Sequence, residues 1–364
     1  MPSKANKTNS SFLTSSTQHL NQLRAAKQEF AAQFLRPATA ESFTALSAAP
    51  SPAPSRNVVG VGIGEKISNG NATGVMAVKL LVRIKYPEDQ IPPGDLLPKT
   101  ANGLPVDVEQ VGTFRRFSPR GAAAAAVAPK MPNPRTKMRP AQPGCSIGFK
   151  DPKNQFVMAG TFGTLVKKGK KLFVLSNNHV LANENRLPLG SPIFQPGLLD
   201  GGNPNSDQIA QLTKFVPLKT GASNKVDGAI AGAKNGSLVS NSILFIGPPR
   251  GTANAQIDMV VHKFGRTTGY RVGRITSIDT DVNVGYDIGT LTFEEQIIIV
   301  GISGQSFSAS GDSGSLILER STQTAVGFLF AGSATHTIAN HFGDFCKPSK
   351  SDWRKAIGKA THGN

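Results

Sequence analysis

Between residues 144 and 345, short apolar segments alternate with turns, and this alternation constrains the fold more than any other feature of the chain. GTFGTLV and LFVLSNN flank the polar turn KKGKK, and YRVGRITSI, EEQIIIV, GSLILE and AVGFLFAG follow further along. β-Branched and aromatic residues fill these segments, while Gly, Asn and Asp fill the intervals between them. Short strands at such spacing predict an all-β barrel or sandwich of about 200 residues.

The rest of the chain divides into shorter units. Residues 1–55 contain the amphipathic segment LNQLRAAKQEFAAQFL and a Pro/Ala linker. Residues 56–118 contain two β-branched runs around the turn SNGNATG, which predict a small β-rich domain. Residues 119–143 are Ala-rich, then Pro-rich and basic, and predict a linker because closely spaced prolines exclude a stable helix or central strand. Residues 346–364 predict a short C-terminal helix and a tail.

The N-terminal segment has apolar residues at helical spacing: Leu20, Leu23, Phe30, Phe34 and Leu35. A helix with such a face usually packs on its own protein, and the alternative is a helix that binds a partner or forms a homo-oligomer. The N-terminus lacks the apolar core of a secretory signal, and no apolar run reaches the ~20 residues that span a bilayer. We therefore expect a cytoplasmic protein without a membrane partner.

The cysteines fit the same compartment. The chain has only Cys145 and Cys346, too few for a disulfide framework. We expect two free thiols, with a single bridge between them as the alternative.

The net charge of +17 raises the question of a nucleic-acid partner. The linker contributes Lys130, Arg135, Lys137 and Arg139, and the turn KKGKK contributes four more lysines. No aromatic residue is interleaved with them and no known nucleic-acid motif occurs. We therefore expect solvated basic turns, and nucleic-acid binding through the basic linker remains an alternative.

The tetrapeptide GDSG at residues 311–314 is either a tight turn or the site of a nucleophile. A serine hydroxyl needs a neighbouring base to become a nucleophile. Among the histidines, His179 in KLFVLSNNHVLA is the best candidate, because an apolar strand breaks there into a polar turn. Asp227 in KVDGAIAGA, just before an apolar strand, is the candidate acid, and Asp207 in a polar loop is the alternative.

LFVLSNNHVLA, KVDGAIAGA and GDSG resemble, in that order, the histidine, aspartate and serine segments of chymotrypsin-like (trypsin-fold) serine peptidases of the bacterial type. KFGRTTGYRVGRI resembles the segment that opens their second barrel, and the resemblance covers roughly residues 144–340. More loosely, the chain is similar to the plant narrow-leaf serine peptidases, which also carry the unit VVGVGIG…VKLLVRIK…LPVDVEQVG ahead of the peptidase. The resemblance implies a mainly β protein with a two-barrel chymotrypsin-like peptidase domain after an N-terminal helix and a small β-rich unit.

The resemblance also implies the catalytic roles. Ser313 attacks the scissile carbonyl, His179 takes its proton, and Asp227 orients the imidazole. The backbone N–H groups of Gly311 and Ser313 form the oxyanion hole. The implied activity is a serine endopeptidase that hydrolyses protein or peptide substrates through an acyl-enzyme.

Two further expectations follow from the resemblance. The pocket residue six positions before the serine is Phe307, which with Phe330 and Ala331 implies a shallow apolar pocket for small or medium uncharged side chains. The carboxylate of Asp312 points inward in the family and needs a cation, for which bacterial relatives use an arginine. Arg266 stands at that position, so we expect a buried Arg266–Asp312 ion pair and no need for N-terminal processing.

Two other classes of function compete with the peptidase. A catalytically silent binding module on the same barrel would usually lack one triad member, and none is missing here. A basic nucleic-acid-associated protein is the other alternative. No metal or cofactor is expected, because neither His-Glu-x-x-His nor Cys-x-x-Cys nor a phosphate loop occurs.

Overall fold

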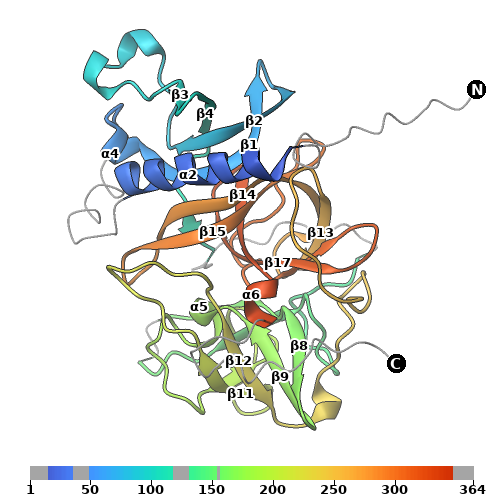
Figure 1. The fold of residues 1–364 in the computed structure, drawn as a ribbon. Helices are drawn as coiled ribbons and strands as arrows, with labels where there is room; N and C mark the ends of the chain where they lie inside the picture. Colours follow the sequence, from blue (N-terminus) through green and yellow to red (C-terminus); the bar gives the residue numbers. More distant parts are fainter. Residues whose placement is uncertain (1–14, 36–48, 118–130, 154–155, 347–364) are drawn as a thin grey trace, which may run out of the picture.

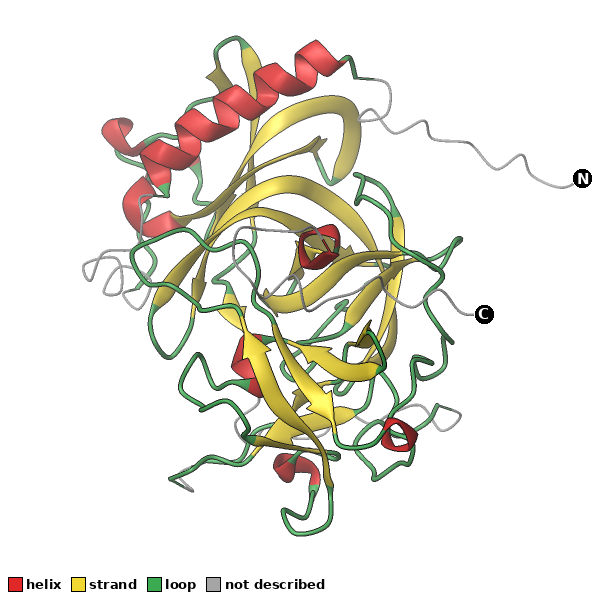
Figure 2. Ribbon diagram, turned by 60° about the horizontal axis from the view of Figure 1, so that its bottom comes forward, coloured by secondary structure: helices red, strands yellow, loops and turns green. Residues whose placement is uncertain are grey.

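The computed structural model describes residues 15–35, 49–117, 131–153 and 156–346. Its strands curve into two groups, and helix α2 (Thr17–Phe34) lies across the outer face of one of them (Figures 1 and 2). The fold class predicted from the sequence is confirmed, since the chain is mainly β and forms two barrel-like sheets.

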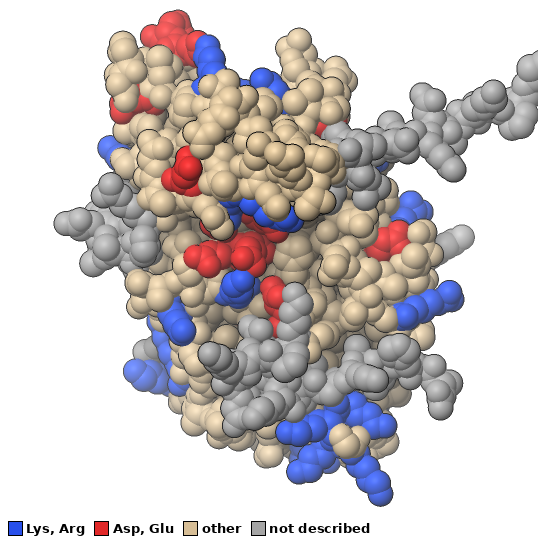
Figure 3. Space-filling view, in the orientation of Figure 1, with Lys and Arg blue, Asp and Glu red and all other residues tan. Residues whose placement is uncertain are grey.

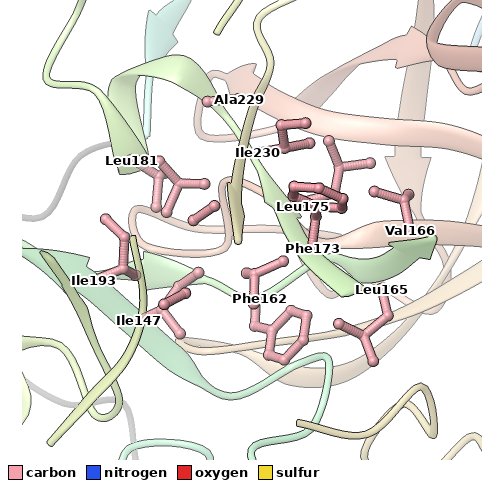
Figure 4. Packing of buried hydrophobic residues seen from close by; sticks show 14 of the residues in the cluster. Ile147, Phe162, Leu165, Val166, Phe173, Leu175, Leu181, Ile193, Ala229 and Ile230 are labelled. Carbon is pink, nitrogen blue, oxygen red and sulfur yellow. The ribbon is translucent and has the colours of Figure 1, made fainter. Parts of the chain in front are cut away.

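The first barrel-like sheet contains seven strands in the order β7-β6-β10-β11-β12-β9-β8. They are β6 (Ser146–Phe149), β7 (Gly160–Thr161), β8 (Thr164–Lys168), β9 (Lys171–Ser176), β10 (Pro192–Phe194), β11 (Gln208–Phe215) and β12 (Ala229–Ala233). β8 and β9 form the hairpin predicted around KKGKK, and Gly169 in its turn has φ 58°. Apolar side chains such as Ile147, Phe162 and Leu175 fill the interior of this sheet (Figure 4).

The second barrel closes on itself. Its strands are β13 (Val260–Gly265), β14 (Gly269–Gly285), β15 (Thr290–Gly301), β16 (Leu316–Glu319), β17 (Ala325–Gly332) and β18 (His336–His341). They pair in the order β13-β16-β17-β18-β15-β14, and β13 also pairs with β14. Closure of the ring leaves these strands without an open edge, except where β14 extends beyond its partner.

That extension attaches the N-terminal unit. The unit comprises β1 (Val58–Ser68), β2 (Asn71–Val82), β3 (Thr100–Ala101) and β4 (Leu104–Gln110). Residues 269–274 of β14 pair with β13, and residues 277–282 pair with β1. The unit predicted as a separate domain therefore continues the sheet of the second barrel, while its boundary at residue 118 remains a prediction.

Helix α2 packs on its own protein. The Ser16 side chain caps its N-terminus by accepting a hydrogen bond from the His19 N–H, 3.1 Å away. Leu23 and Phe30 are buried in a cluster that includes residues of β1 and β2. The apolar face predicted from the sequence thus packs into the core of its own chain, and an oligomer formed through this helix remains a prediction.

The other helices are short: α4 (Pro54–Asn57), η1 (Glu88–Gln90), η2 (Pro93–Asp95), α5 (Asn178–Leu181), η3 (Leu198–Asp200), η4 (Gly236–Leu238) and α6 (Gly343–Cys346). Among the described residues, no helix has the length and apolar character needed to cross a bilayer. The helix predicted after residue 346 lies outside the described residues. Both cysteines are free thiols, as predicted, and burial raises the pKa of the Cys145 thiol to about 12.

Part of the predicted basic linker is fixed to the first barrel. Residues 131–143 are described, and Met138 packs against the core of that barrel. Lys137 Nζ lies 2.5 Å from Asp207 Oδ1, and the Arg139 guanidinium donates to Gln195. The Asp207 carboxylate thus neutralises part of the charge that suggested a nucleic-acid partner.

The lysines of the β8–β9 hairpin remain exposed. Figure 3 shows Lys and Arg side chains gathered at the end of the molecule where β8 and β9 end. They extend from a polar turn, as expected for a solvated surface.

Candidate active site

His179 lies in helix α5, directly after the end of β9. Its Nδ1 is 2.5 Å from Asp227 Oδ2, and both side chains are fully buried. Asp227 directly precedes β12, as the sequence predicted. His179 Nε2 is also buried and has no hydrogen-bond partner in the part of the chain that the structure describes. A carboxylate on Nδ1 fixes the neutral tautomer in which Nε2 carries the free lone pair.

The Asp227 carboxylate is held from several directions. Oδ1 accepts hydrogen bonds from the backbone N–H groups of Asn178, at 2.6 Å, and His179, at 3.3 Å. Oδ2 also accepts from the Tyr286 hydroxyl, at 2.7 Å. The backbone N–H of Asp227 donates to Asn340 Oδ1, at 3.1 Å. These donors orient the carboxylate and balance its buried charge.

Tyr286 is a site residue that the sequence did not reveal. It follows β14 and is buried, and its ring centroid lies 6.0 Å from that of His179. Burial is the main cause that raises the pKa of Tyr286 well above its ordinary value, and the nearby charge of Asp227 raises it further. The phenol therefore stays protonated and acts as a donor to Asp227. No motif marked it, because its partner lies 59 positions away along the chain.

Asp207, the alternative acid, lies in a different network. Its carboxylate pairs with Lys137, and it accepts a hydrogen bond of 2.9 Å from the backbone N–H of Asn203. No hydrogen bond joins it to His179, whereas Asp227 contacts the histidine directly. The geometry favours Asp227 over Asp207.

Ser313 lies in the GDSG turn and is buried. Its hydroxyl contacts the carbonyl oxygens of Phe117, at 3.0 Å, and Phe330, at 3.1 Å. The structure shows no hydrogen bond between Ser313 and His179. The sequence-predicted serine, histidine and aspartate all lie in the buried interior, but only the histidine and aspartate are bonded to each other.

The glycines of the turn are required by its geometry. Gly311 and Gly314 have φ values of 96° and 93°, which side chains disfavour. A Cβ on Gly314 would lie 2.2 Å from Ser176 Oγ and 2.3 Å from the Thr161 carbonyl oxygen. The backbone N–H groups of Gly311 and Ser313 donate to no acceptor among the residues that the structure describes.

The predicted Arg266–Asp312 ion pair is wrong. Asp312 Oδ2 lies 3.0 Å from Lys263 Nζ, and both side chains are fully buried. Thr268 donates to the same carboxylate oxygen from its hydroxyl, at 2.6 Å. Arg266 instead forms a two-pronged pair with Asp200, at 2.7 and 2.5 Å.

The physical reason lies in the positions of the two cations. Lys263 lies within β13 with its side chain directed to the interior, whereas Arg266 lies just beyond the end of that strand. Burial alone would raise the pKa of Asp312, but the charge of Lys263 and hydrogen bonds from Thr268 and backbone groups lower it below its ordinary value. Asp312 therefore keeps its charge with a cation supplied by the chain itself.

The residues predicted to line a specificity pocket are buried. Phe307 is 1% exposed, and a Cβ on Gly273 would lie 2.6 Å from its ring. The Phe330 ring centroid lies 4.6 Å from that of Phe293, within an apolar cluster that also contains Ala331. Phe330 thus offers its backbone carbonyl to the site while its ring packs in the core. The pocket itself remains a prediction.

The solved structures to which this chain is similar include bacterial serine proteases of the chymotrypsin-like type. Thermobifida fusca protease A is 17% identical, with a TM-score of 0.39, and the match covers 56% of this chain and 91% of that chain. Cellulomonas bogoriensis chymotrypsin is 17% identical, with a TM-score of 0.38 and the same coverages. No family model matches the chain.

Protein NARROW LEAF 1 of rice, Oryza sativa subsp. japonica, is a further relative. It is 24% identical over 306 residues, which cover 76% of this chain and 51% of the rice protein. The chain thus spans about half the length of this relative. Both resemblances that the motifs suggested are confirmed.

Proposed function

We propose that this chain is a serine endopeptidase with Ser313 as nucleophile, His179 as general base and Asp227 as the orienting acid. The observation that carries the proposal is the buried His179–Asp227 pair, whose bound Nδ1 leaves Nε2 without a partner among the described residues. His262 Nε2 also lacks a partner among the described residues, but His262 Nδ1 contacts the Tyr270 hydroxyl rather than a carboxylate. The buried carboxylate on Nδ1 therefore distinguishes His179, and it is the arrangement that orients a general base.

The proposed reaction has two halves. Ser313 Oγ adds to the scissile carbonyl while its proton passes to His179 Nε2, and the Gly311 and Ser313 N–H groups bind the oxyanion. The imidazolium then gives the proton to the leaving amine, which leaves an acyl group on Ser313. Water, deprotonated by His179, hydrolyses this ester. For the first step the Ser313 hydroxyl must turn from the carbonyls of Phe117 and Phe330 toward His179.

The test is labelling of the full chain by a fluorophosphonate, with Ser313→Ala as the variant and Ser315→Ala as the control. Ser315 donates to the Asp312 carbonyl oxygen, at 2.6 Å, and has no proposed catalytic role. We expect labelling of the wild type and of Ser315→Ala, and none of Ser313→Ala. Residues 115–117 lie against Ser313, and Arg116 is held there by Glu184 and Asp287. A folded protein that is labelled neither as the wild type nor as Arg116→Ala would therefore indicate a silent binding module.

The acid is tested separately by peptide hydrolysis. Asp227→Asn should lower kcat about 10⁴-fold, because the amide favours the wrong imidazole tautomer. Asp207→Asn is the matched control, since Asp207 contacts Lys137 rather than the histidine. A larger loss in Asp207→Asn than in Asp227→Asn would reject this assignment.

A further inference from the structure

A segment of the chain itself lies against the proposed nucleophile. Strand β5 (Arg115–Arg116) pairs antiparallel with β17, with Arg116 opposite Ala331 and Arg115 opposite Gly332. The next residue, Phe117, donates its N–H to the Phe330 carbonyl, at 3.5 Å. Its own carbonyl oxygen receives the Ser313 hydroxyl, at 3.0 Å.

The main-chain pairing is that of a bound peptide. The Phe117 carbonyl oxygen accepts from the Ser313 hydroxyl and not from the Gly311 and Ser313 N–H groups, so the segment is held as an inhibitor would be rather than as a reacting substrate. A peptide that adds a strand to a sheet edge is held by main-chain hydrogen bonds and is selected through its alternate side chains. The carbonyl presented to Ser313 belongs to Phe117, so this residue occupies the position directly before the bond that a nucleophile at Ser313 would attack. Its ring lies close to Gly332, where a Cβ would meet the ring Cζ at 2.5 Å.

The side chain of Arg116, the residue before Phe117, forms ion pairs with two carboxylates. Its Nε pairs with Glu184 Oε1, and its Nη2 lies 2.5 Å from Asp287 Oδ2. The Glu184 side chain is 1% exposed, and the Arg116 side chain is 9% exposed. A carboxylate buried to this degree needs a cation beside it.

Glu184 is also oriented independently of the arginine. Its carboxylate accepts hydrogen bonds from the backbone N–H groups of Asp287, at 3.2 Å, and Ile288, at 2.9 Å. A buried, preoriented carboxylate with an aspartate beside it matches the planar fork of a guanidinium better than the point charge of a lysine.

We propose that Glu184 and Asp287 form a subsite for a substrate arginine, and that residues 115–117 fill this subsite and the adjoining position as an internal ligand. The proposal rests on the proposed function, and it names the substrate class as peptides with arginine followed by an aromatic residue. This aromatic residue replaces the small or medium side chain expected from Phe307, because the Phe117 ring lies against Gly332. Because the segment is tethered, its effective concentration is on the order of millimolar, and it competes with any external peptide.

The anchor of the internal ligand lies just before it. Phe114 is fully buried, and its carbonyl accepts a hydrogen bond of 3.1 Å from the Gly285 N–H. This hydrogen bond fixes the register of β5 without any contribution from the two arginine side chains. By contrast, Arg115 is exposed, although it carries the same charge as its neighbour. The chain therefore supplies its own control residue.

The test measures binding first, without turnover. In full-length Ser313→Ala protein, a second change, Arg116→Ala, empties the subsite, and a fluorescent peptide of sequence TFRRF, copied from residues 113–117, is titrated by polarisation. We expect binding at least tenfold tighter than to Ser313→Ala alone. TFRQF should bind roughly 30-fold more weakly or worse, because a buried charge loses its partner. TFQRF should bind like TFRRF.

Protein variants complete the design, and they are made in the opened protein, which carries Ser313→Ala and Arg116→Ala. Glu184→Gln in this protein should reduce the preference for TFRRF over TFRQF to less than about threefold. Glu295→Gln, at an exposed ion pair, should leave that preference unchanged. Circular dichroism checks folding, and Phe117→Gly is the opening variant if Arg116→Ala does not fold. Equal binding of TFRRF and TFRQF to the opened protein would overturn the proposal.

The two proposals can fail separately. Fluorophosphonate labelling of the Arg116→Ala protein, with Ser313 intact, reports the catalytic function alone. Absence of labelling together with arginine-dependent binding would reject the peptidase and keep the subsite. Labelling without any arginine preference in binding would keep the peptidase and reject the subsite.

Discussion

The buried ion pair of Lys263 and Asp312 lies next to the proposed nucleophile, because Asp312 directly precedes Ser313. Replacement of Lys263 by methionine tests how much this ion pair stabilises the site. Both side chains are fully buried, with Nζ 3.0 Å from Oδ2. Methionine keeps most of the volume and removes the charge. A buried ion pair that loses one member typically costs about 3–5 kcal/mol. Asp312 keeps hydrogen bonds from the Thr268 hydroxyl and from backbone N–H groups, so we expect a loss near the lower end, about 3 kcal/mol.

The pH dependence has a defined sign. The pKa of Asp312 is lower in the folded protein than its ordinary value, so the pair contributes stability above that ordinary pKa. This contribution is lost as the pH falls through the folded pKa and the carboxylate gains a proton. The difference in unfolding free energy between wild type and Lys263→Met should therefore be largest near pH 7 and shrink below about pH 4.

The assay is urea unfolding near pH 7 and again below about pH 4, combined with fluorophosphonate labelling of the folded protein. Lys225→Met is the control, because Lys225 pairs with Glu295 at the surface and should cost less than about 1 kcal/mol. Lys263→Met should also slow labelling, since Asp312 precedes the nucleophile. The reasoning is refuted if Lys263→Met costs no more than Lys225→Met, or if Arg266→Met abolishes labelling while Lys263→Met does not.

Three further predictions concern other parts of the site and its frame. Tyr286→Phe removes one donor to Asp227, and we expect about a tenfold fall in kcat/KM with a loss below about 2 kcal/mol in unfolding free energy. Gly314→Ala places a Cβ 2.2 Å from Ser176 Oγ at a φ of 93°, and should cost about 2–4 kcal/mol by urea unfolding. Burial alone would raise the pKa of Glu109, but its histidine and lysine neighbours lower it to about 2. Wild-type stability should therefore fall between about pH 5 and pH 2, and Glu109→Gln should flatten this slope, as measured by thermal unfolding.

Local signals in the sequence predicted an all-β barrel or sandwich and located residues next to strand ends, whereas the two barrels were predicted from the family resemblance. The segment KLFVLSNNHVLA places His179 where β9 ends, and the apolar run after Asp227 is β12. In both cases the relevant information is a change between apolar and polar residues within about ten positions. The structure adds what such a signal does not contain, which is the contact between the two side chains.

The sequence was a poorer guide to which residues pair with buried charges. Lys263 lies in the apolar segment MVVHKFG, and nothing in the period of that strand distinguishes an inward lysine from a solvated one. Arg266 was preferred on the family resemblance, yet it turns to Asp200. The choice between two cations three positions apart depends on strand register and on the depth of the carboxylate, and both are tertiary properties.

The strand β5 was not predicted at all. It contains only Arg115 and Arg116, and it pairs with residues of β17 more than 200 positions further along the chain. So short a strand has no periodicity, and charged residues next to a linker resemble a solvated turn. Its position follows from long-range contacts: β1 pairs with β14, which attaches the N-terminal unit to the second barrel and brings β5 to the site.

The turn between β14 and β15 links the proposed triad to the proposed arginine subsite. Tyr286 in this turn donates to Asp227, and the next residue, Asp287, contacts Arg116 while its N–H holds Glu184. Adjacent residues of one tight turn do not move independently, so a peptide that supplies an arginine to the subsite also steadies the donor that orients the catalytic acid. Part of the energy of binding the arginine would then appear as faster chemistry rather than tighter binding. On this reasoning, substrates that lack the arginine should show a lower kcat as well as a higher KM.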